Sequence, residues 1–159
     1  MGTPHLLKSG IVNVVFGENV KIVEPANLYG CEIGDDTFIG PFVEVQKDVR
    51  IGHRCKIQSH AFICELVTIG NDTFIGHGVM FINDLFQNGG PAQGRKDLWR
   101  STTIGSNVSI GSNATILPVK ICDGCVIGAG AVVTKDLTTP GIYVGNPARL
   151  QRQLHIKSL

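Results

Sequence analysis

The sequence has little charge and few aromatic side chains. Asp, Glu, Lys and Arg make up 17% of its 159 residues, and Phe, Trp and Tyr make up 6%. The formal net charge is +1, so a broad nucleic-acid surface, which needs clustered Lys and Arg, is not expected. No apolar run approaches the length of a membrane span. These properties predict one soluble domain around a single core.

Two further features bear on the cellular compartment. The first residues, Met1 to His5, do not have the charged and apolar segments of a secretory signal. The five cysteines are an odd number, which argues against a disulfide framework. We therefore expect a cytoplasmic protein.

An apolar residue recurs at every sixth position through much of the chain, in a composition that is 43% hydrophobic. A small or β-branched residue lies four places after most of these positions, and glycine often follows directly. The apolar series is Ile33, Ile39, Val45, Ile51, Ile57, Ile63, Ile69, Ile75 and Phe81. The smaller residues are Thr37, Val43, Val49, Cys55, Ala61, Val67, Thr73 and Val79. Such a run indicates an internal repeat.

A period of six fits neither an amphipathic helix nor a simple alternating strand. It suits a short strand followed by a bend, repeated three times per coil, with each coil hydrogen-bonded to the next. We expect the aliphatic residue to point inward, the smaller residue to fill the space beside it, and glycine or a small polar residue to make the bend. The fold predicted is therefore an all-β parallel solenoid stabilised by its neighbouring coils.

The repeat extends from Phe16 to Val133, with one five-residue step after Leu28 and another after Ile116. It fails between residues 83 and 103, where turn residues cluster. We interpret this segment as a functional loop leaving one corner, the alternative being a tolerated insertion. The predicted organisation is an N-terminal tail at 1–10, a solenoid at 11–150 and a C-terminal cap at 151–159.

Cys122 and Cys125 have the spacing of a redox or zinc pair. The repeat places Cys125 in the small inward slot and Cys122 at a corner position normally taken by glycine. Their side chains are therefore expected to diverge, and the sequence has no second pair to complete a zinc site. We interpret both as structural and expect no bound metal.

His60 and His77 are 17 residues apart, close to one coil of 18. They are expected near each other on adjacent coils, at or near an outer face. This makes them candidate polar groups of a site.

Three segments carry a family resemblance: residues 104–111, residues 127–136, and Gly145 to Arg149. Together they resemble the hexapeptide-repeat acyltransferases. The resemblance implies a left-handed parallel β-helix, a homotrimer, and acetyl-CoA as co-substrate in a groove between two subunits. Gly111, Ala129 and Ala131 are small enough for the pantetheine arm to approach the backbone.

Lys135 and Arg149 stand near the C-terminal end and suit the phosphates of CoA. The alternative is that these two residues only cap the last coil.

A narrower resemblance concerns the loop. Asn83 opens it and an Arg95-Lys96-Asp97 cluster follows, which is similar to the nucleotide-sugar N-acetyltransferases. These include enzymes that acetylate UDP-linked diamino glucuronic acid and related dTDP-amino sugars. The basic and aromatic residues suited to a nucleotide diphosphate are Arg95, Lys96, Trp99 and Arg100. A solvated charge cluster is the alternative.

The reaction expected is direct attack of a sugar amine on the acetyl thioester, because no cysteine is placed as a nucleophile. His77 is the preferred proton acceptor and His60 the second, with Glu65 available to orient either. We expect Asn83 and Asp84 to orient the amine. Backbone N–H groups between Gly76 and Gly78 are candidate donors to the thioester oxyanion.

Three alternatives stay open. O-acetylation of a sugar or serine would need a base more strictly, because a hydroxyl must lose its proton as it attacks. A zinc hydratase like the γ-class carbonic anhydrases needs a close downstream pair of histidines, which this sequence lacks. A non-catalytic scaffold has no need of the Gly145 to Arg149 motif or of the basic loop.

Overall fold

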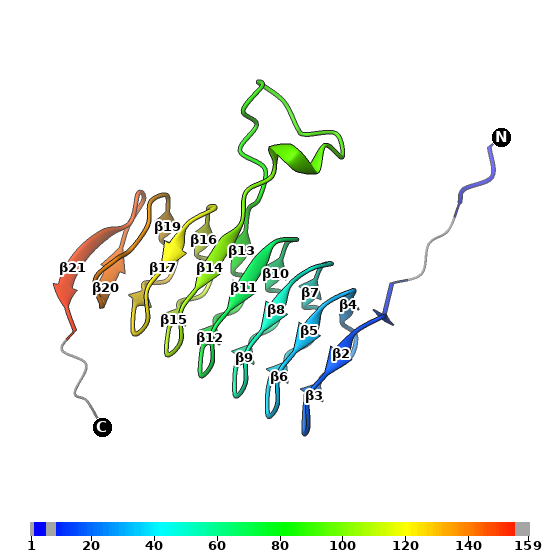
Figure 1. Cartoon of the computed structure of the whole chain (residues 1–159), viewed down its shortest axis with the longest axis horizontal. Helices are drawn as coiled ribbons and strands as arrows, with labels where there is room; N and C mark the ends of the chain where they lie inside the picture. Colours follow the sequence, from blue (N-terminus) through cyan, green and yellow to red (C-terminus); the bar gives the residue numbers. More distant parts are fainter. Residues whose placement is uncertain (1, 6–8, 155–159) are drawn as a thin grey trace.

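The computed structural model describes residues 2–5 and 9–154. The chain winds as a β-solenoid of about 7 turns, and each coil crosses three parallel sheets in turn (Figure 1). We call these sheets A, B and C, and name each corner by the two sheets that it joins. This confirms the predicted all-β solenoid of six-residue repeats.

The strands are short because each one covers only one side of a coil. Sheet A holds β1 (Ile11–Val12), β4 (Asn27–Tyr29), β7 (Glu44–Val45), β10 (Phe62–Ile63), β13 (Met80–Phe81), β16 (Thr115–Ile116) and β19 (Val132–Val133). Sheet B holds β2 (Val15–Phe16), β5 (Glu32–Ile33), β8 (Arg50–Ile51), β11 (Val67–Ile69), β14 (Thr102–Ile104) and β17 (Lys120–Ile121). Sheet C holds β3 (Lys21–Ile22), β6 (Phe38–Ile39), β9 (Lys56–Ile57), β12 (Phe74–Ile75), β15 (Ser109–Ile110), β18 (Val126–Ile127), β20 (Gly141–Val144) and β21 (Arg149–Gln153).

The core consists of columns of like residues along the solenoid axis. Every member of the nine-residue apolar series is at most 4% exposed, as are all eight of the smaller residues predicted beside it. Strand register puts the isoleucines directly above one another, for example Ile39 over Ile57 and Ile57 over Ile75. At the N-terminal end the column is incomplete, and Phe16 is 38% exposed.

Many of the bends are made by glycine or a small polar residue, as expected, and Gly30 and Gly78 are glycine bends with φ of 59° and 65°. Several bends use a polar residue in the left-handed region, where short Asn and Asp side chains are tolerated, with φ between 56° and 61°. These residues are Asp36, Asp48, Asp72, Asn107 and Asn113. The glycines after the inward isoleucines instead permit close stacking. A Cβ on Gly70 would lie 2.6 Å from the carbonyl carbon of Gly105 in the next coil.

The stacked glycines form what we call the glycine column, at the B–C corner. Its members are Gly17, Gly34, Gly52, Gly70 and Gly105, with Cys122 at the same place in the last full coil. Each of these residues donates its backbone N–H to a carbonyl of the next coil.

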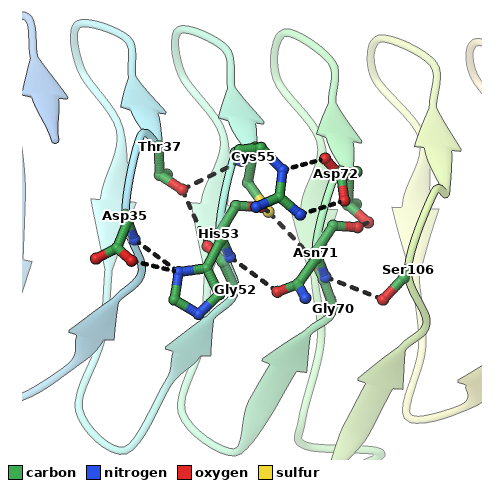
Figure 2. A network of polar contacts seen from close by, with 11 residues as sticks. Asp35, Thr37, Gly52, His53, Cys55, Gly70, Asn71, Asp72 and Ser106 are labelled. Carbon is green, nitrogen blue, oxygen red and sulfur yellow. Dashed lines mark hydrogen bonds and ion pairs between the residues drawn. The ribbon is translucent and has the colours of Figure 1, made fainter. Parts of the chain in front are cut away.

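Beside the glycine column, a ladder of side chains caps the backbone of the B–C corner (Figure 2). The N–H of Asp35 donates to His53 Nδ1 over 3.0 Å, and the N–H of His53 donates to Asn71 Oδ1 over 2.9 Å. Asn71 continues with its own N–H to Ser106 Oγ over 3.1 Å. His53 is therefore a structural residue of this corner.

The last strand closes the C-terminal end. β21 pairs antiparallel with β20, in contrast to the parallel pairing of every other neighbouring pair of described strands. The turn between them contains Gly145 and the cis peptide bond Asn146–Pro147. Of the predicted tail and cap, residues 1, 6–8 and 155–159 lie outside the described residues.

Candidate functional site

His77 is exposed at the C–A corner, just after β12. Its Nδ1 lies 2.8 Å from the hydroxyl oxygen of Ser59, which occupies the same place in the preceding coil. This contact fixes the ring by one nitrogen and leaves Nε2 for another partner. If Nδ1 carries the proton and donates to Ser59, Nε2 is the basic atom.

His60 is also at the C–A corner but contacts a different residue. Its ring stacks on Phe42 with 4.9 Å between centroids and an interplanar angle of 27°. The prediction that His60 and His77 share one corner on adjacent coils agrees with this placement. The register nevertheless pairs His77 with Ser59, so the two histidines have separate partners.

Two of the three expected oxyanion donors are already engaged. The N–H of Gly76 donates to the carbonyl of Ile110, and that of Gly78 donates to the carbonyl of Ser59. Both bonds hold adjacent coils together. The N–H of His77 remains as the candidate donor at this corner.

The loop between β13 and β14 leaves the solenoid at the A–B corner and projects beyond the coils (Figure 1). Its base is closed by the N–H of Arg100, which donates to the carbonyl of Asn83 over 2.9 Å. Asn83 also donates from Nδ2 to the carbonyl of Glu65, one coil earlier. Asn83 therefore fastens the loop to the solenoid.

Asp84 organises the loop from within. One carboxylate oxygen accepts the N–H of Phe86 over 2.9 Å, and the other accepts the N–H of Ala92 over 2.7 Å. Because both oxygens serve the backbone, the expectation that Asp84 orients a substrate amine is not supported by this arrangement.

The loop contains one short 3-10 helix, η1 (Lys96–Leu98). Lys96 forms an ion pair with Glu65, whose side chain is only 14% exposed. The ammonium lies 5.5 Å from the ring centroid of Trp99, within cation–π range. The hydrogen bond that Lys96 donates to Glu65 raises the pKa of Lys96 above its usual value, so the ammonium is charged at neutral pH.

The other two cations of the loop differ in their surroundings. Arg95 pairs with Asp97 over 2.9 Å, and both side chains are 65% exposed. Arg100 donates to the backbone carbonyls of Asp97 and Trp99 and to the side chain of Gln87. Arg100 is thus part of the loop's own structure, whereas Arg95 faces solvent.

A polar ladder below the loop was missed by the sequence reasoning. Glu65 donates its N–H to Gln46 Oε1, and Gln46 Nε2 donates to Glu44 over 2.9 Å. Tyr29 lies beside this ladder, and its pKa is raised by burial first and then by Glu44 and Glu65. The signal in the sequence was the spacing of 19 residues, about one coil, between Gln46 and Glu65.

A groove of about 710 Å³ on the outer face of sheet C was also missed. Its lining residues include Lys21, Phe38 and Lys56, which are in register on β3, β6 and β9. Gln58, beside Ser59 of the C–A corner, also lines it. The groove therefore offers two cations, the carboxylate of Asp36 and an aromatic ring on the sheet that leads to the C–A corner.

Within one chain, His77 and the loop do not meet. His77 precedes β13 at the C–A corner, and Asn83 follows β13 at the A–B corner. A site that used both would need to be completed across the face of sheet A.

The predicted CoA residues divide into exposed and enclosed ones. Ala129, Lys135 and Arg149 are exposed. Ala131 is fully buried in the core, with its N–H and carbonyl bonded to Gly128 and Thr115, which corrects its assignment to a ligand groove. Gly111 is explained by packing, because a Cβ there would lie 2.5 Å from the backbone nitrogen of Ala129.

The prediction that Cys122 and Cys125 diverge is wrong. Their sulfur atoms lie 3.5 Å apart. A side chain on the inward slot and one at the glycine column meet because the bend between them turns through Gly124, at φ 70°. In the described ranges, no group of three His, Cys, Asp or Glu side chains is placed to hold a metal ion.

The described part of the chain also contains no helix that is long and apolar enough to cross a membrane.

Two segments of the chain match the repeats of known protein families. Residues 30–65 match the family described as bacterial transferase hexapeptide (six repeats), and residues 101–135 match the hexapeptide repeat of succinyl-transferase. The chain therefore carries hexapeptide-repeat segments of the bacterial transferase type.

Among curated proteins, the bifunctional protein GlmU of Baumannia cicadellinicola subsp. Homalodisca coagulata is 31% identical over 91% of this chain and 31% of its own length. The GlmU of Acinetobacter baumannii (strain AYE) is 36% identical over 86% of this chain and 28% of its own. The chain thus spans about a third of the length of these relatives.

Solved structures share the fold. AntD, an N-acyltransferase from Bacillus cereus in complex with dTDP and Coenzyme A, matches with a TM-score of 0.71 and 23% identity, over 91% of this chain and 85% of that one. A hexapeptide-repeat acetyltransferase, VCA0836 from Vibrio cholerae in complex with acetyl-coenzyme A, matches with a TM-score of 0.64 and 23% identity, over 87% and 70%.

Proposed function

We propose that this protein is an acetyl-CoA-dependent acetyltransferase that acylates the amino group of a nucleotide-linked amino sugar used in bacterial surface polysaccharide. The observation that carries the proposal is the His77–Ser59 contact, which presents an oriented imidazole on the outside of a hexapeptide solenoid. The kinship of its repeats with bacterial transferases supports acyl transfer. The N-acyltransferase AntD, which has the same fold and binds dTDP and Coenzyme A, supports a nucleotide-linked acceptor.

The chemistry requires no covalent intermediate on the protein. The amine nitrogen attacks the thioester carbonyl, the carbon–sulfur bond breaks, and CoA leaves as the thiol. Nε2 of His77, with Nδ1 held by Ser59, takes the proton that the amine loses and passes it to the sulfur of the departing CoA. The N–H of His77 is the donor left at this corner for the oxyanion.

The acetyl-CoA site is proposed at the C-terminal coils. Ala129 is exposed, and a Cβ placed on the neighbouring Gly130 would meet no atom within 4 Å. The backbone there is thus open to a narrow ligand arm. Lys135 and Arg149 are exposed cations suited to the phosphates. Lys135 forms no ion pair with the described residues, so its charge is available.

The acceptor site is proposed at the loop, with Arg95 and Trp99 toward the nucleotide and Lys96 and Glu65 setting the loop's position. Because His77 and the loop lie at different corners of one chain, we propose that a homotrimer completes the site between subunits. Because the proposed reaction uses acetyl-CoA and a nucleotide sugar, which are available in the cytoplasm, we propose that the protein acts there.

A thiol-release assay with acetyl-CoA tests the proposal. The panel should hold UDP- and dTDP-linked 3-amino and 4-amino sugars, serine, and a simple hydroxylated sugar. Thiol release with one amino sugar and none with the hydroxyl acceptors is expected. Release with a hydroxyl acceptor alone would establish O-acetylation instead. Silence across the panel, with no CoA binding by calorimetry, would overturn acyl transfer and favour a scaffold.

A further inference from the structure

Cys122 breaks the rule of the glycine column. In the other coils a side chain at this place would collide with the next coil, since a Cβ on Gly105 would lie 2.9 Å from the carbonyl carbon of Cys122. After Cys122 the chain does not form another full coil of the same kind. Its N–H still bonds to Leu137, but Leu137 belongs only to an isolated bridge. A side chain is tolerated here because the stack ends.

Cys125 fills the inward slot of the same corner, three residues later, and is fully buried. Cys122 is only partly buried. The two sulfur atoms are 3.5 Å apart, so they must approach by about 1.5 Å to reach the length of a disulfide bond. The other three cysteines, Cys31, Cys55 and Cys64, are all buried.

We propose that Cys122 and Cys125 form a reversible intrachain disulfide when the protein meets a peroxide, with Cys122 as the residue oxidised first. The thiolate of Cys122 attacks one peroxide oxygen and becomes a sulfenic acid, and the other oxygen leaves as water after protonation. The sulfur of Cys125 then attacks the sulfur of Cys122, and its proton leaves with the hydroxide as a second water. Two thiols and one hydrogen peroxide therefore give one disulfide and two waters.

The surroundings of the pair favour this order of events. Burial, followed by the contact with Cys122, raises the pKa of the Cys125 thiol to about 12, so Cys125 is protonated and poorly reactive until its partner is oxidised. The Cys125 thiol also donates to the carbonyl of Thr139 over 3.6 Å. Oxidation removes that donor, but the hydroxyl of Tyr143 still donates to the same carbonyl over 2.7 Å. The disulfide therefore leaves no buried acceptor without a partner.

The test is peptide mass spectrometry of the intact protein after brief treatment with hydrogen peroxide. Trypsin releases both cysteines in one peptide, Ile121–Lys135. We expect this peptide to lose the mass of two hydrogen atoms and to regain it with dithiothreitol. A thiol titration under denaturing conditions should then find three of the five thiols left.

Cys55 provides a matched control because it occupies the same inward column as Cys125 and is equally buried, but has Gly52 three residues before it. The Cys55→Ala protein should form the pair as the wild type does. Cys125→Ser should instead accumulate a sulfenic acid at Cys122 that dimedone captures, and melting temperatures will show whether each variant folds. The proposal would be overturned if Cys122 of the wild type were oxidised by oxygen addition without forming the Cys122–Cys125 disulfide. It would also be overturned if both thiols stayed unreacted or if the disulfide linked two chains.

Discussion

The imidazole of His77 is held by the hydroxyl of Ser59 on the coil before it, with 2.8 Å between Nδ1 and Oγ. The two residues are 18 positions apart, and they meet because one coil of the solenoid returns the chain to the same corner. Such a pair orients a base without burying it, since His77 remains exposed.

Replacing His77 tests its role as proton acceptor. We expect His77→Ala to lower kcat by about 10²-fold, because a positioned base contributes on that order or more. Ser59→Ala should lower kcat by less than about tenfold, since it removes only the orientation of the ring. Steady-state kinetics with the preferred amino sugar measure both.

The control for this experiment is His53→Gln, at the B–C corner, which should leave kcat within about twofold of the wild type. Undiminished kcat in His77→Ala would show that the amine arrives neutral and needs no base from the protein.

The ion pair between Glu65 and Lys96 is expected to hold the loop against the solenoid. Its contribution is present below the usual pKa of a lysine, 10.5, and is lost as the pH rises through the higher pKa of the folded protein. Glu65→Gln should therefore speed tryptic cleavage of the loop at neutral pH by several-fold, and raise KM for the acceptor more than KM for acetyl-CoA.

Asp97→Asn is the matched control for the loop. It breaks a pair whose side chains are both 65% exposed and which lies wholly within the loop. Such pairs contribute little, so cleavage should change much less. Equal cleavage of Glu65→Gln and the wild type would rule out anchoring by Glu65.

Acetyl donors with and without the phosphates of CoA can show whether Lys135 and Arg149 bind the cofactor or only cap the last coil. Losing a charge-assisted contact costs about 1.5–3 kcal/mol, so Lys135→Gln and Arg149→Gln should each raise KM for acetyl-CoA about tenfold or more. With acetyl-pantetheine, which has no phosphates, neither variant should differ from the wild type. A Lys120→Gln variant, at an exposed lysine of sheet B, controls for loss of surface charge. Equal losses with both donors would mean that the residues only cap the coil.

Gly70 tests why the glycine column exists. Gly70→Ala places a Cβ 2.6 Å from the backbone of the next coil, so we expect a loss of about 1–3 kcal/mol in the free energy of unfolding, or more. The melting temperature should fall by roughly 3–10 °C. In contrast, Gly90→Ala meets no atom within 4 Å and should change stability by less than about 0.5 kcal/mol. Calorimetry should compare the melting temperatures of the two variants. Similar values would contradict close stacking of the coils as the reason for glycine at position 70.

Arg54 donates two hydrogen bonds to the carboxylate of Asp72 at the B–C corner, and this pair predicts a pH dependence of stability. The hydrogen bond from Arg54 lowers the pKa of Asp72 below 3.8. Its stabilisation is therefore present above 3.8 and lost as the pH falls through the lower pKa of the folded protein.

Thermal melts across this pH range should show Asp72→Asn less stable than the wild type at neutral pH, with the difference closing in acid. Glu24→Gln removes an exposed carboxylate that forms no ion pair with the described residues, and it should show no such closing. A constant difference at all pH values would point to an effect other than ionisation.

The sequence by itself determined the solenoid. Nine apolar residues at intervals of six can be buried together only if each coil returns to the same place, and the structure buries every one of them. The break in this rhythm also located the loop, because a segment with no inward residues cannot stay in the stack. The homotrimer and the CoA groove between subunits stay predictions of the family resemblance.

The tertiary structure decided which side chains face one another. Ser59 and His77, Glu65 and Lys96, and Cys122 and Cys125 are pairs whose contacts depend on corner geometry. Their sequence spacing gives neighbouring coils or a shared bend, but not the direction of each Cα–Cβ bond. Ala131 is a different case, because it lies four places after Ile127, in the inward slot for small residues, and the periodicity alone places it in the core. Periodicity defines the columns, and the backbone dihedral angles at the bends decide where each side chain points.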